Sequence, residues 1–271
     1  MDLSIIIPCY NEEKRLNRTL ERVSEYLASK NYISEVVIVD NGSTDQTVAI
    51  AQSFMEKIKN LSIIFERHHG KGWAVREGML YAKGKNRLFM DADNSTDIAQ
   101  VEALLDRINA GFDVAIGSRK APDAIIQNPP PLRRQVMSAA FSRLVRSIVP
   151  LGLKDTQNGF KLFRDTASEV VFPHQTIFYW AWDVEILAIT KELGFSIAEV
   201  PITYVDDSNS TMRLGGMVRM LYEVIITRIN LLTSSYVKNE RRISERRTEE
   251  RRGTERADRE KDRRTISNRR A

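Results

Sequence analysis

The first 120 residues alternate between two hydrophobic periods, and this alternation is what most constrains the fold. Helical spacing at 12–29, 45–58, 72–82 and 97–109 separates five short apolar runs, at 4–8, 35–40, 61–66, 87–91 and 113–118. Apolar strands that alternate with helices indicate a mostly parallel sheet covered by helices on both faces. Ser43 and Gln46 have capping-box spacing, which predicts a helix starting just after Asp40.

Polar residues gather where these expected strands end. Ligands of open α/β sheets bind beyond the carboxyl ends of the strands. Five loops occupy those ends, at 8–12, 40–45, 68–72, 91–97 and 117–119. We therefore expect one rim of the sheet to carry the functional site.

Asp91 and Asp93 follow the fourth apolar run, two positions apart. Carboxylates placed in this way can share a hard divalent cation that bridges phosphate oxygens of a ligand. Such an ion stabilises charge on a departing diphosphate. The alternative is that Asp93, Asn94 and Asp97 are turn residues and caps of the next helix. The polar loops at the same rim favour the cation.

In the remainder of the chain, the sequence predicts a loop followed by a helix, a mixed strand and helix region, and a last helix. A proline-rich loop at 119–131 leads into a helix at 132–148 with one apolar face, and a last amphipathic helix spans about 215–236. Between these two helices we expect a mixed addition of strand, helix and hairpin, at residues 155–163, 182–193 and 195–205. We divide the chain into a domain at 1–212, an amphipathic helix at 213–238 and a disordered Arg/Glu-rich tail at 239–271.

The charge distribution excludes one class of function for the body of the chain. Residues 240–271 hold 13 Lys and Arg against 8 Asp and Glu, which accounts for the whole net charge of +5. The preceding 239 residues carry 28 charges of each sign. A neutral body is not that of a basic nucleic-acid binder. The single cysteine, Cys9, excludes an internal disulfide and fits a reducing compartment.

Six motifs in order resemble the inverting family 2 glycosyltransferases of GT-A fold, whose sheet is mostly parallel and Rossmann-like. The resemblance is closest to the dolichyl- and polyprenyl-phosphate sugar transferases, in particular the dolichyl-phosphate β-glucosyltransferase type, and it covers about residues 3–212. The motifs are PCYNE (8–12), DNGSTD (40–45), GKGWAVREGM (70–79), DADNSTD (91–97), GSR (117–119) and DTQNGFKLF (155–163).

The resemblance assigns roles at the donor site. It implies that Asp93, with Asp91 beside it, holds Mg²⁺ or Mn²⁺ on the diphosphate, and that Asp91 faces the ribose or sugar. Dolichyl-phosphate mannose synthases have a metal-contacting glutamine two residues past this pair, where this chain has Ser95. The remaining donor-site residues implied are Pro8, Tyr10 and Glu12 in the nucleoside pocket, Asp40 at the base edge and Lys71 near the nucleotide.

The acceptor side has a physical argument of its own. Arg133 and Arg134 fall in the first turn of the helix at 132–148, where the helix dipole disfavours a cation unless an anion is bound. Ser138 lies one turn along, and Arg119 can converge on the same point. Arginine forks suit a phosphate monoester, and the resemblance assigns this cluster to the lipid phosphate. The alternative is a solvated basic turn.

A phosphate acceptor also removes the need for a general base. Its oxygen is already anionic near neutral pH, so positioning and leaving-group stabilisation carry catalysis. Asp183 and Glu185 are the candidates if a base is required. They point apart on a helix, so at most one faces the sugar, and Asp183 is the better candidate. We therefore assign catalysis to Asp91, Asp93 and Asp183.

Contact with a membrane follows from a lipid acceptor. The sequence has no apolar run of the roughly 18–20 residues that would cross a bilayer. The last helix, flanked by Arg213, Arg219 and Arg228, either lies in the membrane interface or packs against the body. The glucosyltransferase type usually carries an N-terminal anchor, whereas this sequence opens on the first expected strand. We expect a cytoplasmic protein bound peripherally at the cytoplasmic membrane face.

The sequence thus predicts transfer of a hexose, with UDP-glucose the favoured donor, to polyprenyl or dolichyl phosphate with inversion. Where the family often has a lysine after the last expected strand, this chain has Thr211, with Arg213 as the nearest cation. Within the class, the alternative is a glycan or other hydroxyl acceptor, with Asp183 or Glu185 as base.

Two alternatives come from other classes. A binding protein acting through its tail lacks the aromatic residues of specific nucleic-acid recognition. A nucleotidyltransferase usually has a glycine-rich basic loop after the first strand, where this chain has PCYNEE.

Overall fold

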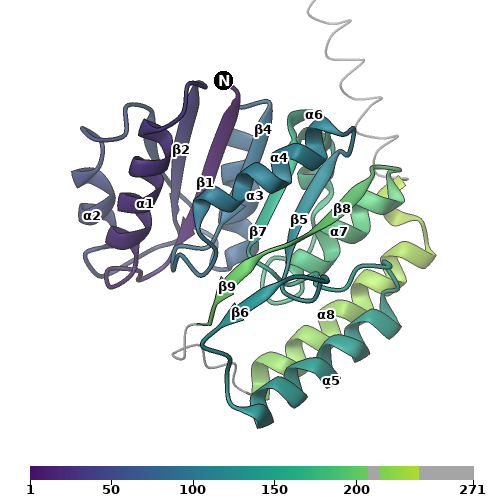
Figure 1. The fold of residues 1–271 in the computed structure, drawn as a ribbon. Helices are drawn as coiled ribbons and strands as arrows, with labels where there is room; N and C mark the ends of the chain where they lie inside the picture. The colour runs from purple at the N-terminus through teal and green to yellow at the C-terminus, as the bar shows by residue number, and fades with distance from the viewer. Residues whose placement is uncertain (207–213, 238–271) are drawn as a thin grey trace, which may run out of the picture.

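The fold is a seven-stranded sheet between two layers of helices, as seen in a computed structural model that describes residues 1–206 and 214–237 (Figure 1). The strand order is β3-β2-β1-β4-β7-β5-β8, and only β7 in this sheet runs antiparallel to its neighbours. The strands of the sheet are β1 (Leu3–Cys9), β2 (Ser34–Asp40), β3 (Leu61–Phe65), β4 (Asn86–Met90), β5 (Val114–Ser118), β7 (Phe160–Arg164) and β8 (Ile197–Pro201).

Three helices cover each face of the sheet. Along β1, Ile5 and Ile7 pack into one buried cluster and Ile6 into the other, so the strand is apolar throughout because both its faces are covered. The first face carries α1 (Leu16–Ala28), α2 (Thr47–Ser53) and α4 (Val101–Asn109), which a short 3₁₀ turn (Ile98–Gln100) precedes. The second carries α3 (Lys71–Tyr81), α6 (Asp165–Val171), a 3₁₀ turn (Phe172–His174) and α7 (Trp182–Glu192).

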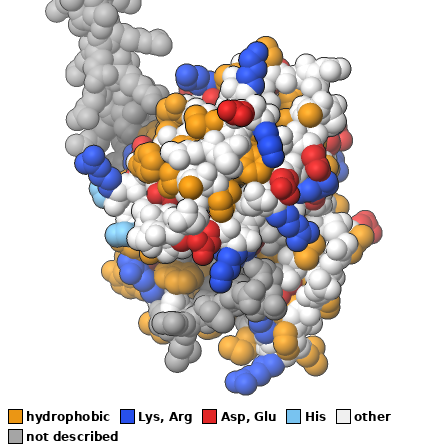
Figure 2. Space-filling view, turned by 90° about the vertical axis from the view of Figure 1, so that its left-hand side faces the viewer, with side chains coloured by type: hydrophobic (Ala, Val, Ile, Leu, Met, Phe, Trp, Pro, Cys, Tyr) orange, Lys and Arg blue, Asp and Glu red, His pale blue; other side chains and the backbone are white. Residues whose placement is uncertain are grey.

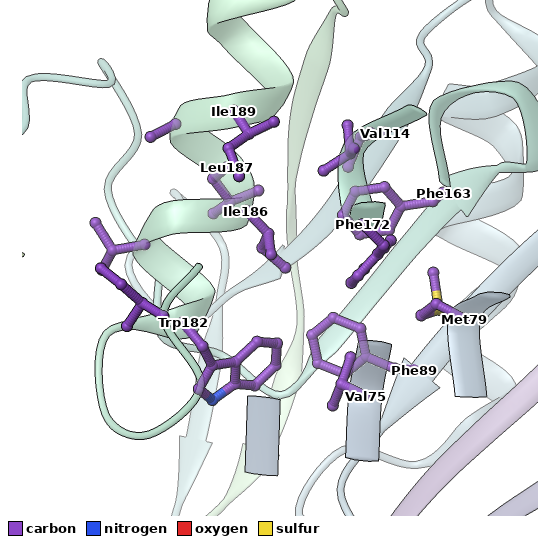
Figure 3. Packing of buried hydrophobic residues seen from close by; sticks show 14 of the residues in the cluster. Val75, Met79, Phe89, Val114, Phe163, Phe172, Trp182, Ile186, Leu187 and Ile189 are labelled. Atoms are coloured by element: carbon purple, nitrogen blue, oxygen red, sulfur yellow. The ribbon is translucent and has the colours of Figure 1, made fainter. Parts of the chain in front are cut away.

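The core of the second face is aromatic near its centre. Phe89 on β4 lies 5.2 Å, ring centre to ring centre, from Trp182 at the start of α7 (Figure 3). Phe163 and Phe172 pack edge to face further along. These contacts fix the first turn of α7 over the middle of the sheet, and that turn carries Asp183.

One expected helix start is wrong. The capping-box spacing of Ser43 and Gln46 predicted a helix just after Asp40, but α2 begins at Thr47. The carboxylate of Asp40 accepts from the backbone N–H groups of Gly42 and Ser43, and the Ser43 hydroxyl accepts from the N–H of Asn11. These bonds make a turn in place of a cap, because the side chains are used to join two neighbouring loops.

A second, smaller assembly lies at one end of the molecule. The strands β6 (Ile125–Gln127) and β9 (Thr203–Val205) pair in parallel, and α5 (Leu132–Ile148) lies beside α8 (Leu214–Leu232) (Figure 1). Met220, Val224 and Tyr236 are buried against α7 and its neighbours. Of the sequence expectations, those concerning Thr211, Arg213 and the tail at 239–271 lie outside the described residues.

The sheet opens where β1 and β4 separate. Pairing of β1 with β2 runs to Cys9 and Asp40, whereas pairing of β1 with β4 ends at Ile6 and Phe89. Pro8, which has no N–H to donate, falls just past that point. The strand order reverses here, because the chain runs from β1 outward to β3 and then returns to β4 on the other side of β1. The gap between the two strand ends is therefore the switch point at which ligands bind.

The described surface gives two further observations. Within residues 1–206 and 214–237, none of the helices combines the length and the hydropathy needed to cross a bilayer. The face shown in Figure 2 intersperses Lys and Arg with Asp and Glu and has no continuous basic patch. That distribution agrees with the balanced charge of the first 239 residues.

Candidate active site

A cavity of about 500 Å³ occupies the switch point. It is open to solvent and is walled by the end of β1, the turn after β4 and the first turns of α3. Of the predicted donor-site residues, all but Asp40 line it. The lining residues are Pro8, Cys9, Tyr10, Glu12, Arg15, Asn41, His69, Gly70, Lys71, Ala74, Asp91, Ala92 and Asp93.

Lys71 and Asp91 form an ion pair within this cavity. The pair joins the first residue of α3 to the turn after β4, and both side chains remain partly exposed. Asp91 is also fixed by its backbone, whose N–H donates to the carbonyl of Gly159 at 3.1 Å. A Cβ atom at position 159 would overlap the Asp91 carboxylate, so any residue other than glycine would displace that carboxylate.

The glycines on either side of Lys71 have a steric cause. A Cβ on Gly70 would lie 2.6 Å from the carbonyl oxygen of Phe178, and one on Gly72 would lie 2.7 Å from the Cα of Phe178. The N–H of Gly72 donates to that same carbonyl, and the ring of Trp73 stacks on Phe178 at 3.5 Å. The GKG sequence therefore lets segment 175–181 approach the start of α3 closely, which sets the position of Lys71.

Asp93 lies between two cavities. It lines the first cavity and also a second, of about 940 Å³, together with Lys14, Arg18 and Asp206. One Asp93 oxygen accepts from the N–H of Ser95 at 2.9 Å. The side-chain oxygens of Asn94 and Ser95 next to it are buried without a hydrogen-bond partner.

These oxygens fit a hard divalent cation. In the described part of the chain, no group of three or more His, Cys, Asp and Glu side chains could by itself enclose a metal ion. Mg²⁺ commonly needs no such cage, because one or two carboxylates bind it together with substrate phosphates and waters. Asp91 and Asp93, with the unpartnered amide oxygen of Asn94, are the oxygen donors at this place.

The end of β1 supplies the nucleoside side of the cavity. The aromatic ring of Tyr10 is 55% exposed and is available for stacking on a base. Glu12 accepts two hydrogen bonds from Arg15. Burial raises the pKa of Glu12, although the Arg15 guanidinium opposes the shift. Cys9 is a free, buried thiol, and burial raises its pKa well above the usual value.

Asp40 is buried and its carboxylate is engaged in its own turn, as described above. The neighbouring Asn41 lines the cavity instead. Its side-chain N–H group donates to the carbonyls of Glu66 and His68, and its oxygen accepts from the N–H of Gly70. Asn41 therefore connects the end of β2 to the loop that carries Lys71. The role predicted for Asp40 at the base edge remains a prediction.

Asp183 lies on the first turn of α7 with a buried lysine near it. Lys161, on β7, is fully buried, donates to the carbonyl of Asn158, and lies 5.1 Å from the ring of Phe89 and 5.9 Å from that of Trp182. Burial raises the pKa of Asp183 to about 6, and Lys161 opposes the shift. Burial lowers the pKa of Lys161 to about 8, with Asp183 opposing. The two groups thus keep each other charged near neutral pH.

Glu185 points away from Asp183, as its helical position predicts. It is fully buried and accepts from the N–H groups of Thr176 and Ile177 and from the Tyr236 hydroxyl. A carboxylate with these partners holds segment 175–181 in place and has no access to a substrate.

The basic residues predicted for the acceptor side are divided between two places. Arg119 binds Asp155 through two nitrogens, at 2.8 and 2.9 Å, and its guanidinium lies over the ring of Tyr204. Burial would raise the pKa of Asp155, but Arg119 outweighs this and holds it at about 2. Arg134 pairs with Asp206 at 3.5 Å, while Arg133 and Ser138 are exposed on α5.

Sequence reasoning did not identify three of the structural contributors. Asn41 follows Asp40 within the DNGSTD motif, but its hydrogen bonds form only where the loops meet. Lys161 lies in the apolar strand FKLF, and a charge there signals a buried partner. The segment at 175–181 carried no recognised pattern, although its aromatic residues pack beside Lys71.

A crevice at the switch point of a parallel sheet, lined by paired aspartates and a lysine, defines a nucleotide-sugar transferase of GT-A type. The chain belongs to glycosyl transferase family 2, whose model matches residues 4–172. Its sequence is 35% identical over 262 residues to the dolichyl-phosphate beta-glucosyltransferase of Saccharomyces cerevisiae, covering 88% of this chain and 78% of the relative. The human enzyme of the same name is 30% identical over 257 residues, with coverages of 89% and 79%. The chain is therefore a glycosyltransferase.

A solved structure shares the fold. Glucosyl-3-phosphoglycerate synthase from Mycobacterium tuberculosis, in complex with Mn²⁺, UDP and glucosyl-3-phosphoglycerate, superposes with a TM-score of 0.64 at 17% identity. The match covers 85% of this chain and 79% of that one. The GT-A fold predicted from the sequence is thereby confirmed.

Proposed function

We propose that the chain transfers glucose from UDP-glucose to dolichyl or another polyprenyl phosphate, with inversion at the anomeric carbon. The observation that carries this proposal is the similarity to dolichyl-phosphate beta-glucosyltransferases over 88% of the chain, which reaches well beyond the family-wide region at 4–172. In the reaction, an acceptor phosphate oxygen attacks the anomeric carbon. The bond from that carbon to the β-phosphate of UDP breaks, and UDP leaves.

The donor lies in the 500 Å³ cavity in this proposal. The ring of Tyr10 stacks on the base, with Pro8 and Glu12 shaping the pocket around it and Asp40 near the base edge. Lys71 faces the diphosphate, where its charge stabilises the developing negative charge of the leaving group. Its ion pair with Asp91 keeps it in place before the donor binds.

A divalent cation completes the donor site. Asp93 and Asp91 would hold Mg²⁺ or Mn²⁺, which neutralises charge on the diphosphate when bound. Support comes from the oxygen donors at this turn and from the solved relative that contains Mn²⁺ with UDP. A further solved complex of the same synthase contains Mg²⁺ and UDP.

Asp183 is 8% exposed and does not line the cavity, but its charge acts on Lys71, so in this proposal it acts from beneath the site. Glycosyl transfer passes through an oxocarbenium-like transition state, which a nearby carboxylate stabilises. A phosphate acceptor needs no proton removed, so Asp183 contributes charge and is not a general base. The alternative function, transfer to a glycan hydroxyl, requires Asp183 as base, since the hydrogen bonds of Glu185 occupy that residue.

The acceptor phosphate would approach between Arg119 and the start of α5. Arg133, Arg134 and Ser138 lie on the first two turns of that helix, and Arg119 is held ready by Asp155. The phosphate would replace the partly exposed ion pair of Arg134 with Asp206, whose two side chains are 38% and 14% exposed.

The lipid chain needs an apolar surface, and α5 and α8 offer one. Large apolar side chains on both helices remain exposed, and the helices lie side by side (Figure 1). We propose that this surface lies on a bilayer, at its cytoplasmic face. The single free thiol of the chain, Cys9, fits the reducing conditions on that side. The exposed residues are Leu132, Val136, Met137 and Leu144 on α5 and Val218, Tyr222, Ile225, Ile229 and Leu232 on α8.

The test is transfer of radiolabelled sugar from a panel of UDP- and GDP-sugars to a short polyprenyl phosphate, with Mg²⁺ or Mn²⁺. We expect label from UDP-glucose in the organic phase and its loss in Asp93→Ala. Lys57→Met, in the exposed turn after α2, is the control for a general effect of substitution. Donor binding without lipid-phase label would reject the lipid acceptor and favour a glycan.

A further inference from the structure

Helix α7 begins without a cap of its own. Its N-cap position is Ala181, which has no side chain able to accept a hydrogen bond, although the first turn carries Asp183. The free N–H groups at a helix start need hydrogen-bond partners, and burying such a group without a partner is unfavourable. Within the first turn, the N–H of Val184 donates to the Asp183 carboxylate. The two N–H groups just before the helix, those of Trp180 and Ala181, donate to a side chain from a distant part of the chain.

Glu223 on α8 provides it. One Glu223 oxygen accepts from the backbone N–H groups of Trp180 and Ala181, each at 2.8 Å. The other accepts from Arg219, whose guanidinium lies 3.8 Å from the centre of the Tyr179 ring. Glu223 is 7% exposed, so its charge is balanced by these bonds and not by water.

Segment 175–181 is therefore fixed at both ends by buried carboxylates. Glu185 accepts from the N–H groups of Thr176 and Ile177, and Glu223 accepts from those of Trp180 and Ala181. Between them, Phe178 contacts Gly72 beside Lys71. The Lys71 side of the segment is thus held by Glu185 and by the Trp73 stack, whereas the Asp183 side depends on Glu223.

We propose that Glu223 is a positioning residue for the transfer reaction: by binding Trp180 and Ala181 from α8, it fixes the residues that lead into α7 and so holds Asp183 in place. This inference rests on the proposed function for its kinetic consequence. It also connects the start of α7 to the exposed helix pair, because Val218, Tyr222 and Ile225 lie on the same helix as Glu223 with their side chains exposed. Seating α8 against a lipid surface then stabilises the start of α7.

The chain contains a natural reporter of this junction. Its three tryptophans are Trp73, Trp180 and Trp182, and all lie on segment 175–182 or stacked against it. Tryptophan emission, excited selectively over that of tyrosine, therefore reports on this region. A readout exists even if no sugar is transferred.

The experiment compares Glu223→Asp with Glu223→Gln. The aspartate keeps the charge but withdraws its oxygens from Trp180 and Ala181, whereas the glutamine oxygen still reaches both N–H groups. We expect Glu223→Asp to lower kcat by about tenfold to a hundredfold, with KM for UDP-glucose changed less than about twofold. Its tryptophan emission should shift to the red, while Glu223→Gln retains more than about half the turnover and the original emission.

The matched control is Glu35→Asp. Glu35 is equally buried and accepts from Ser4 and from the N–H of Lys83, at the amino end of the sheet away from the site. It should lose stability without a change in kcat or emission. If Glu223→Asp shows unchanged emission and the kinetics of the control, the proposal is wrong. If the wild type transfers no sugar to lipid phosphate, the proposed function fails, and the emission shift alone decides the role of Glu223.

Discussion

The donor side and the acceptor side of this molecule are built in different ways. On the donor side, each loop is bonded to its neighbour: Asn11 to Ser43 and Thr44, Asp45 to Glu13, and Asn41 to Gly70. On the acceptor side, α5 and α8 expose apolar side chains, among them Leu132 at 74% and Val218 at 66%. The donor cavity is thus preorganised by the chain itself, whereas the proposed acceptor surface leaves apolar side chains without a partner from the described chain.

The largest expected effect tests the preorganisation of the donor side. Gly159→Ala places a methyl group where the Asp91 carboxylate lies, so both Asp91 and its partner Lys71 must move. We expect a loss of about a hundredfold in kcat/KM with every acceptor. Steady-state transfer assays and circular dichroism would check activity and folding together.

A substitution at a second glycine, Gly194, distinguishes displacement of the Asp91 carboxylate from a general loss of stability. Gly194 has a φ of +84° and open space around its Cα, so Gly194→Ala strains the backbone without touching the site. It should lower the melting temperature and leave kcat unchanged. Equal activity losses in the two variants would refute the role given to Gly159.

The next effect concerns the buried charge pair of Lys161 and Asp183. Lys161→Met removes the cation that opposes the raised pKa of Asp183, which is about 6 in the intact protein. The acidic limb of the rate profile, where activity rises with pH as Asp183 ionises, should move upward by about one unit or more. A pH–rate profile for kcat measures this directly.

Lys57→Met is the matched control for that shift, because Lys57 also lies over an aromatic ring, that of Phe54, but far from the cavity. Its profile should coincide with that of the wild type. An unmoved acidic limb in Lys161→Met would show that Asp183 does not govern the rate.

A smaller effect, on lipid binding alone, tests the proposed acceptor side. Val218→Asp with Ile225→Asp should weaken binding to phospholipid vesicles by about tenfold or more, because two exposed apolar side chains lose their contact with lipid. Affinity for UDP-glucose should not change. Vesicle co-sedimentation measures the affinity for lipid, and titration with UDP-glucose measures the affinity for the donor.

Ile33→Asp serves as the control, since Ile33 is 62% exposed just before β2, at the amino end of the sheet. It should bind vesicles as the wild type does. If both sets of variants bind equally well, the α5 and α8 surface is not the lipid-facing one.

The smallest effect is expected from the tail. Ending the chain after residue 237 removes the residues that hold the excess positive charge, while every site residue named above lies before it. Transfer to a short acceptor should change by no more than about twofold. A large loss would support the alternative in which the tail carries the function.

The strands and the donor motifs could be predicted from sequence because their signals are local. An apolar run such as EVVIVD, rich in valine and isoleucine, indicates a strand covered on both faces, and it forms β2 as expected. The helix start after Asp40 could not be predicted, because the choice between a cap and a turn depended on Asn11 from another loop.

The acceptor side was less predictable for a related reason. Both apolar helices were expected, yet which face of each would remain exposed depends on how α7 and α8 pack. The insertion of β7 antiparallel between β4 and β5 has no local signal either. Glu223 reads as an ordinary helical glutamate in the sequence, and only its distance from Trp180 reveals its role.

The lone buried thiol of Cys9 has a practical consequence. Burial raises its pKa well above the usual value, so the reactive thiolate form is scarce. We therefore expect Cys9 to react far more slowly with maleimides and spin-label reagents than an exposed cysteine does. A probe introduced at Tyr222 or Leu132 would label a single place, and the depth of each helix in a bilayer could be read without first re-engineering the protein.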